Sequence, residues 1–157
     1  MVSTLTSGSE GRIFRGRTHV LRTGPGVSMD ITLEVTTGPS TSLCSIALGA
    51  PASIVDQTHD YASNTGQAFF LEAYHGGVNV PWGQGGRYPV LQAPNSRSVL
   101  VFHVRGTALT FSMGANGAAV TPQPGPVTGE PHWTLPSQFH LLVACHNLGY
   151  SFKVSVA

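Results

Sequence analysis

The amino-acid sequence predicts an all-β chain that folds as an antiparallel β-sandwich of the jelly-roll kind, with little or no helix. Apolar and polar residues alternate without a fault from Val27 to Val35, which is typical of a strand with one buried and one solvated face. Similar short apolar segments recur at intervals of roughly 8 to 15 residues, as in all-β domains. Turn-forming clusters such as Gly24-Pro25-Gly26 separate these segments.

The predicted strands cover, in chain order, residues 27–35, 43–48, 53–61, 68–74, 98–105, 107–113, 139–146 and 150–156. Two neighbouring pairs are predicted to form hairpins. Gly106 separates the first pair. Asn147-Leu148-Gly149 separates the second, a short loop whose glycine suits a positive φ. The segment Thr121 to Pro131 is rich in proline, which donates no ladder hydrogen bond, so it is expected to be a surface connection or an edge.

Residues 12–157 are expected to form one domain, preceded by a flexible segment over residues 1–11. A chain of 157 residues is long enough for one core and short for two. The start of the sequence lacks the basic and apolar regions of a signal peptide, and no window approaches the roughly 20 apolar residues of a membrane helix. The protein is therefore expected not to be transmembrane, and to be cytoplasmic or secreted without a signal peptide.

The charge pattern argues against a nucleic-acid partner. Charged residues make up 10% of the chain and the formal net charge is +1, whereas proteins that bind a phosphate backbone usually carry a basic face. The arginines between Arg12 and Arg22 form the densest cationic cluster, and the expectation for them is an ordinary solvated face.

The two cysteines, Cys44 and Cys145, stand far apart and lie in apolar runs. Neither belongs to a CxxC or CxxH pair, so the sequence predicts neither a zinc site nor a disulfide framework. We expect reduced, buried thiols.

No catalytic or metal-binding motif is present, so the protein is not expected to be an enzyme or to need a cofactor. The seven histidines show no metal-ligand spacing. Three of them lie in predicted strands and are expected to be hydrogen-bonded structural residues: His103, His140 and His146. A glycosidase needs two facing carboxylates, and Asp56, Asp60 and Glu72 are weak candidates for that role.

The middle of the chain is dense in aromatic and planar polar side chains, from Gln57 to Arg87. An aromatic ring can stack on the apolar face of a sugar while planar polar groups bind its hydroxyls. A metal-free carbohydrate site is one interpretation of this composition. The other is that these residues are simply the solvated faces of two strands and a loop.

The stretch WGQGGR, from Trp82 to Arg87, resembles the WGxExR motif of the galectins, β-sandwich lectins that bind β-galactosides without a metal. The order of the surrounding segments is similar too. Gly24-Pro25-Gly26 precedes a long strand, His75-Gly76-Gly77 precedes the tryptophan, and two later strand pairs end the chain. The resemblance implies a galectin-like sandwich over residues 12–157 in which Trp82 stacks on a sugar ring.

Several residues depart from the galectin pattern. Gly85 stands where the motif has its glutamate. The best counterpart of the family's HxNxR keeps His59 but has Tyr61 and Ser63 in place of asparagine and arginine.

Alternation predicts that Phe70, Glu72 and Tyr74 face outward, with Phe69, Leu71 and Ala73 in the core. The candidate carbohydrate-binding residues are His59, Tyr61, Glu72, Tyr74, His75, Asn79, Trp82, Gln84 and Arg87.

Two functions from different classes follow. The first is a lectin with altered or reduced β-galactoside specificity, whose partners are glycans or glycoproteins and whose weak single sites would benefit from a homo-oligomer. The second is a structural or protein-interaction module that keeps the sandwich and has lost sugar binding. In that case Trp82 would pack against a strand or a partner.

Overall fold

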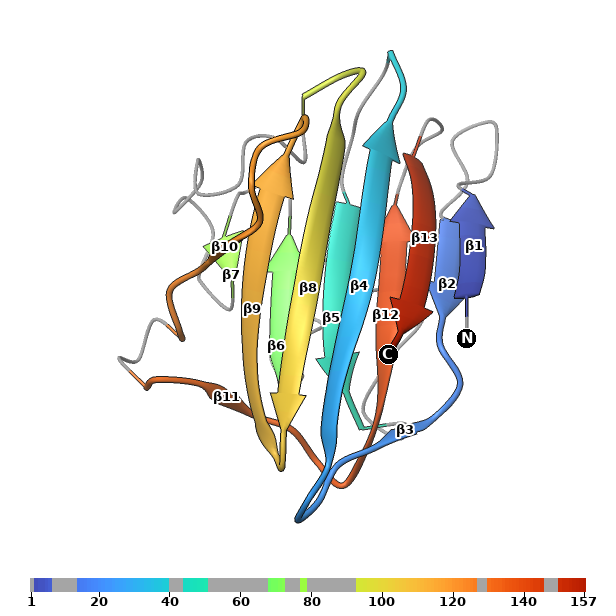
Figure 1. The fold of residues 1–157 in the computed structure, drawn as a ribbon. Coiled ribbons are helices and arrows are strands. Elements are labelled where there is room, and N and C mark those ends of the chain that lie inside the picture. Colours follow the sequence, from blue (N-terminus) through green and yellow to red (C-terminus); the bar gives the residue numbers. More distant parts are fainter. Residues whose placement is uncertain are drawn as a thin grey trace.

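A computed structural model of the chain describes residues 2–6, 14–39, 44–50, 68–72, 77–78, 93–126, 130–145 and 150–157. In this part of the chain, strands β1 to β13 form two antiparallel sheets that pack face to face, and no helix occurs (Figure 1). The predicted antiparallel β-sandwich is therefore confirmed.

The two sheets are built from strands that are far apart in the sequence. The seven-stranded sheet has the order β1 (Val2–Thr6), β13 (Tyr150–Val156), β4 (Ser28–Thr37), β8 (Arg97–Arg105), β9 (Ala108–Ala115) and β10 (Thr121–Pro122), with β11 (Trp133–Thr134) also paired to β9. The six-stranded sheet has the order β2 (Phe14–Arg17), β12 (Gln138–Cys145), β5 (Cys44–Gly49), β6 (Phe69–Glu72) and β7 (Gly77–Val78), with β3 (Leu21–Arg22) also paired to β12.

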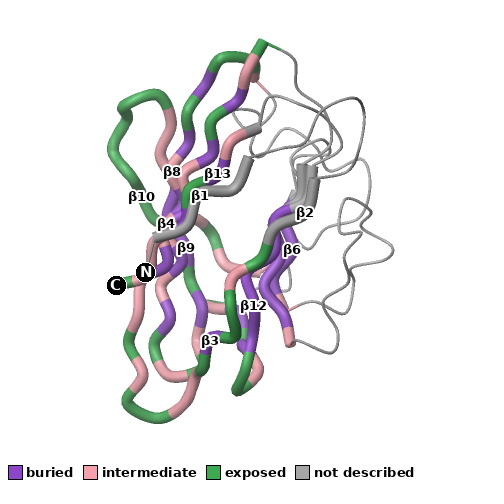
Figure 2. The backbone as a smooth tube through the Cα atoms, turned by 90° about the vertical axis from the view of Figure 1, so that its right-hand side faces the viewer, coloured by how far each residue is buried: buried purple, intermediate pink, exposed green. Residues whose placement is uncertain are grey.

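The core lies between the two sheets, as the alternating pattern predicts. Ile31, Leu33 and Val35 of β4 are buried, whereas the polar residues between them are not. Figure 2 shows buried stretches in both layers, with β6 and β12 in one and β4 and β9 in the other. Facing them from the other sheet are the buried residues of β5, β6 and β12 that point inward, listed here in chain order: Ile46, Leu48, Phe69, Leu71, Phe139, Leu141 and Val143. The central strands are therefore held together mainly by burial of apolar side chains.

Aromatic rings join the sheets at one place in this core. The ring of Phe69 in β6 makes edge contacts with Phe102 of β8, Phe111 of β9 and Trp133 of β11, at centroid distances of 5.2, 5.3 and 5.1 Å. Edge-to-face pairs at such distances are favourable beyond their buried area. Phe69 therefore fixes β6 against three strands of the opposite sheet.

One predicted hairpin is confirmed and the other is wrong. β8 and β9 pair through Gly106, which has a positive φ of 64°. β12 and β13, by contrast, do not pair, because β12 lies in the six-stranded sheet and β13 lies in the seven-stranded sheet. A short glycine-containing connection allows the chain to pass between two packed sheets as well as to reverse within one. The local sequence therefore did not decide the pairing.

Other predicted segments have different outcomes. Residues 2–6, within the segment expected to be flexible, form β1 and pair with β13. Thr121–Pro122 forms the short edge strand β10, which agrees with the expectation for the proline-rich segment. The strand predicted at residues 53–61 lies outside the described residues.

A close backbone approach at Gly114 holds the end of β9. An ideal Cβ at this position would lie 2.8 Å from the carbonyl oxygen of Ala118 and 2.9 Å from that of Ala119. Real side chains do not tolerate such contacts with a backbone, so this turn requires glycine at position 114.

We expect Gly114→Ala to lower the free energy of unfolding by about 1–3 kcal/mol, because the backbone at residues 118–119 must move away. Urea denaturation measures the change as a lower midpoint at constant slope. Gly117→Asn is the matched control, because nothing lies within 4 Å of a Cβ at Gly117 and asparagine tolerates its φ of 83°. Equal midpoints for Gly114→Ala and wild type would show that the close approach is unimportant.

Candidate functional site

Most of the residues predicted to bind a carbohydrate lie outside the described part of the chain: His59, Tyr61, Tyr74, His75, Asn79, Trp82, Gln84 and Arg87. Glu72 is described only in its backbone, at the end of β6 opposite Ser45 and Gly77. The described strands that lead to this part of the chain are β5, β6 and β7.

β5, β6 and β7, the three described strands nearest before Trp82 in the chain, form one end of the six-stranded sheet. β5 pairs with β12 on one side and with β6 on the other. Residues 45–48 of β5 are bonded directly to β6, so no other strand lies between these two strands there. β6 then pairs with β7, which ends at Val78. In the sequence, Trp82 comes four positions after Val78, which lies in the strand at the end of this sheet's described order.

The face of this sheet that points away from the core is apolar at its centre. Phe70, Ala47 and Leu142 are cross-strand neighbours on that face, and Phe70 is only 1% exposed. The prediction that Phe70 faces away from the core is confirmed, but the side chain is buried rather than solvated. This row therefore offers no polar group to a ligand.

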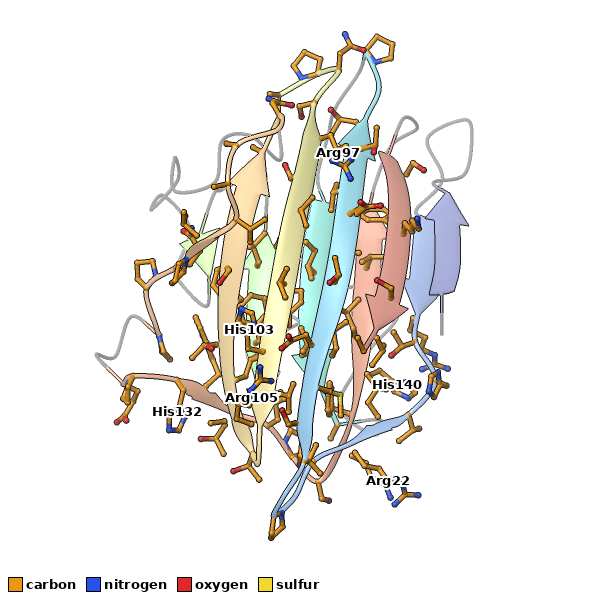
Figure 3. All side chains as sticks on the ribbon, in the orientation of Figure 1. Arg22, Arg97, His103, Arg105, His132 and His140 are labelled. Carbon is orange, nitrogen blue, oxygen red and sulfur yellow. The ribbon has the colours of Figure 1, made fainter. Side chains whose placement is uncertain are left out.

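A polar network crosses three strands on the outer face of the seven-stranded sheet (Figure 3). Nδ1 of His103 in β8 lies 3.0 Å from Oδ1 of Asp30 in β4, and Nε2 of the same ring lies 3.0 Å from Oγ of Ser112 in β9. Arg105 lies beside it, with NH2 at 2.9 Å from Oδ1 of Asp30. The strand register explains the arrangement, because Asp30 and His103 are direct cross-strand partners.

Hydrogen-bond chemistry fixes the direction of this network. A carboxylate can only accept, so Nδ1 of His103 donates to Asp30. In the neutral ring Nε2 then accepts from the hydroxyl of Ser112. The expectation that His103 is a hydrogen-bonded structural histidine is confirmed.

Aspartate, histidine and serine in this order are also the contacts of an activated serine nucleophile. Two observations speak against that role. Ser112 is only 7% exposed, and its strand pairs with β8 on one side and with β10 on the other. Within the described residues, the backbone of β9 is thus occupied by neighbouring strands rather than free to stabilise an oxyanion. We interpret the network as a tie between β4, β8 and β9.

Electrostatics keep Asp30 ionised. The hydrogen bond from His103 is the largest influence that lowers the pKa of Asp30 below its ordinary value of 3.8, and Arg105 lowers it further, while burial acts in the opposite direction. The network is therefore complete at neutral pH.

A second charged group lies towards the other end of the same face. Arg97 of β8 forms an ion pair with Glu34 of β4, and Nζ of Lys153 in β13 lies 4.0 Å from Oε2 of the same carboxylate. These side chains are partly or largely exposed, so each pair contributes little to stability. Together the two clusters make this face polar, in contrast to the apolar row around Phe70.

Three further described residues that the sequence singled out match their expectations. Nδ1 of the buried His140 lies 2.7 Å from the carbonyl oxygen of Thr18, which confirms its predicted hydrogen-bonded role. Arg17 and Arg22, from the N-terminal cationic cluster, are exposed as expected. His146 lies outside the described residues.

Clusters of metal-ligating side chains and membrane-spanning helices are both absent from the described residues. No group of three His, Cys, Asp or Glu side chains in the described ranges could hold a metal ion. Within the same part of the chain, no helix is long and apolar enough to cross a membrane.

No protein-family model matches the sequence, and no curated protein matches it. Solved structures do match. The seed lectin of Lotus tetragonolobus has a TM-score of 0.50 and 10% identity, with 100% of this chain and 98% of the lectin covered. The SPRY domain of human HERC1 has a TM-score of 0.49 and 13% identity, with 98% and 87% covered. CG-16, a homodimeric agglutinin from chicken liver, has a TM-score of 0.43 and 11% identity, with 100% of both chains covered.

These comparisons concern the fold. At 10% identity, the likeness to the Lotus lectin shows a shared β-sandwich architecture and no more. The chain therefore shares a β-sandwich fold with this lectin.

Sequence reasoning did not find the partners within the polar network. Asp30 and His103 are separated by 73 positions, and only the register of β4 against β8 brings them together. The one available signal was that Asp30 and His103 each lie in a predicted strand, but the pairing of those strands was not predicted.

We expect Asp30→Asn to lower the stability of the protein at pH 7 by less than about 1 kcal/mol, because the carboxylate is 43% exposed and exposed charge pairs are weak. Since the pKa of Asp30 is lower in the folded state, its charge stabilises the fold above the unfolded pKa. That contribution is lost as the pH falls through the folded pKa.

Urea midpoints at pH 7 and at about pH 3 measure this difference, which should shrink at the lower pH. Thr36→Ala, an exposed change on β4, is the control that should leave the pH dependence unchanged. If the urea midpoints of Asp30→Asn and wild type differ by the same amount at both pH values, the charge of Asp30 does not stabilise the fold as described.

Proposed function

We propose that this chain is a metal-independent, non-enzymatic lectin of the galectin type, with altered or reduced specificity for β-galactosides. The observation that carries the proposal is the WGQGGR stretch, whose tryptophan comes four positions after Val78, the end of β7. An aromatic ring that follows so soon after a strand of this sheet is suited to stacking on a sugar.

The lectin-type sandwich supports the proposal at the level of the fold. The Lotus protein that shares this architecture is itself a seed lectin. Folds host many functions, so the assignment rests on the residues around Trp82 and not on the architecture alone.

The polar contacts to a sugar are proposed to come from side chains near Trp82. His59, Gln84 and Arg87 would bind hydroxyl groups, since imidazole, amide and guanidinium groups all suit that task. The auxiliary contacts proposed are Tyr61, Glu72, Tyr74, His75 and Asn79. The apolar, buried row runs from Leu142 through Ala47 to Phe70 of β6, so the site is proposed beyond this row, on the β7 side of the sheet.

The proposed partners are glycans or glycoproteins, with no nucleic acid. A single shallow polar site binds weakly, so a homo-oligomer would raise the apparent affinity through avidity. Either a cytoplasmic protein or one secreted without a signal peptide is compatible with this proposal.

The same apolar row favours one alternative, a structural or protein-interaction module. A buried Phe70 where the sequence predicted a solvated face means that less of the sheet is open to a ligand. Gly85 in place of the motif's glutamate also removes an acceptor for sugar hydroxyls. In this alternative Trp82 is an anchor for a protein partner.

We expect a glycan array probed with the purified protein to show binding that Trp82→Ala weakens tenfold or more, which corresponds to about 1.4 kcal/mol. Trp82→Phe is the matched control, because it keeps a ring that can stack. Wild-type binding no higher than that of Trp82→Ala, with both proteins folded by circular dichroism, would reject the lectin proposal.

Tryptophan fluorescence should separate the lectin from the alternative. Trp133 is only 5% exposed and has the other indole of the chain, so subtracting the spectrum of Trp82→Phe isolates the emission of Trp82. We expect this emission to come from a solvated indole and to change on addition of a glycan that binds the array. A blue-shifted emission with no response to sugar favours the interaction module.

A further inference from the structure

Cys44 and Cys145, the only two cysteines in the sequence, are direct cross-strand partners. Cys44 is the first residue of β5 and Cys145 is the last residue of β12. The two strands run antiparallel and keep their register without interruption from His140 opposite Gly49 to Cys145 opposite Cys44. The pair therefore lies at one end of the β5–β12 ladder.

The neighbouring hydrogen bonds show which kind of pair this is. The carbonyl oxygen of Leu141 accepts a hydrogen bond from the backbone N–H of Thr18 at 3.0 Å. The backbone N–H of Leu141 donates to Oγ1 of Thr18 at 3.1 Å. The backbone groups of Leu141 thus point away from β5. Backbone N–H and C=O groups point to alternate sides from one residue of a strand to the next. Cys145 is four positions after Leu141, so its backbone groups also point away from β5. Cys145 and Cys44 therefore form a non-hydrogen-bonded pair.

This type of pair has the spacing that a disulfide requires. Cα atoms in non-hydrogen-bonded pairs are about 4.5 Å apart, the closer of the two antiparallel spacings. Disulfides span Cα separations of about 4.4–6.8 Å. Alternation also places both positions on one face of the sheet, the face that Ile46 and Val143 share.

We propose that Cys44 and Cys145 form an intramolecular disulfide that links β5 to β12 when the protein meets a low-molecular-weight disulfide such as oxidised glutathione. One thiolate attacks the oxidant and releases a reduced glutathione. The second thiolate then attacks the mixed disulfide and releases another. The two cysteines lose two protons and two electrons, and the oxidant is reduced to two thiols.

The bond would connect segments that are distant in the chain. It closes a loop of about a hundred residues, and long loops are where a cross-link restricts the unfolded chain most. The sequence predicted reduced thiols because the cysteines are far apart. Strand register brings them together, and the redox state then depends on the compartment. This inference does not depend on the proposed lectin function.

We expect the native protein to lose both free thiols in oxidised glutathione and to yield a Cys44–Cys145 peptide in a non-reducing digest. The melting temperature of the oxidised form should rise by about 5–10 °C and return on reduction. The same buffers are used during refolding from the reduced, denatured state, so that shielding of the thiols in the native protein cannot hide the reaction.

The matched control shifts one cysteine by a single position. In the double variant Ala144→Cys/Cys145→Ala the composition is preserved, but residue 144 is opposite Ser45 and belongs to the other face of the sheet. This variant should keep its thiols free or form mixed disulfides only. Free thiols in wild type after both treatments would overturn the proposal, as would equally fast intramolecular oxidation of the shifted variant.

Discussion

The contact of Phe69 with the aromatic rings of the opposite sheet is the interaction on which the arrangement of this molecule depends. β6 has four residues and β7 has two, which is too little ladder to fix a hairpin firmly. The three edge contacts of Phe69 reach β8, β9 and β11 and so tie β6 to the seven-stranded sheet. β6, the strand with which β7 pairs, is thereby held against the opposite sheet.

The two outer faces of the sandwich differ in chemistry. Although charges are few, the outer face of the seven-stranded sheet has two clusters of them, one around Asp30 and one around Glu34. The described centre of the other outer face has Ala47, Phe70 and Leu142, all of them buried. A binding function at the end of the six-stranded sheet therefore does not compete with the charged face for the same surface.

The sequence predicts those features that depend on a short stretch of consecutive residues. The alternation from Val27 to Val35 identifies β4 and its buried face, and Gly106 marks the β8–β9 turn. Which sheet a strand joins is decided by residues far away in the chain. For this reason the sequence wrongly predicted a hairpin between β12 and β13, which lie in different sheets. Asp30 and His103, like Cys44 and Cys145, meet only through strand register, which no short pattern contains. The tryptophan motif is visible in the sequence because it is contiguous, whereas the partners of Trp82 depend on the fold.

One edge of the seven-stranded sheet is closed by the chain itself. β10 and β11 both pair with the far side of β9, near its two ends, at Met113 and at Leu109. Unpaired strand edges are templates for edge-to-edge aggregation, and proline at position 122 makes β10 a poor template. Growth of this sheet by a strand from another molecule is thereby directed to its opposite side, where β1 is the terminal strand.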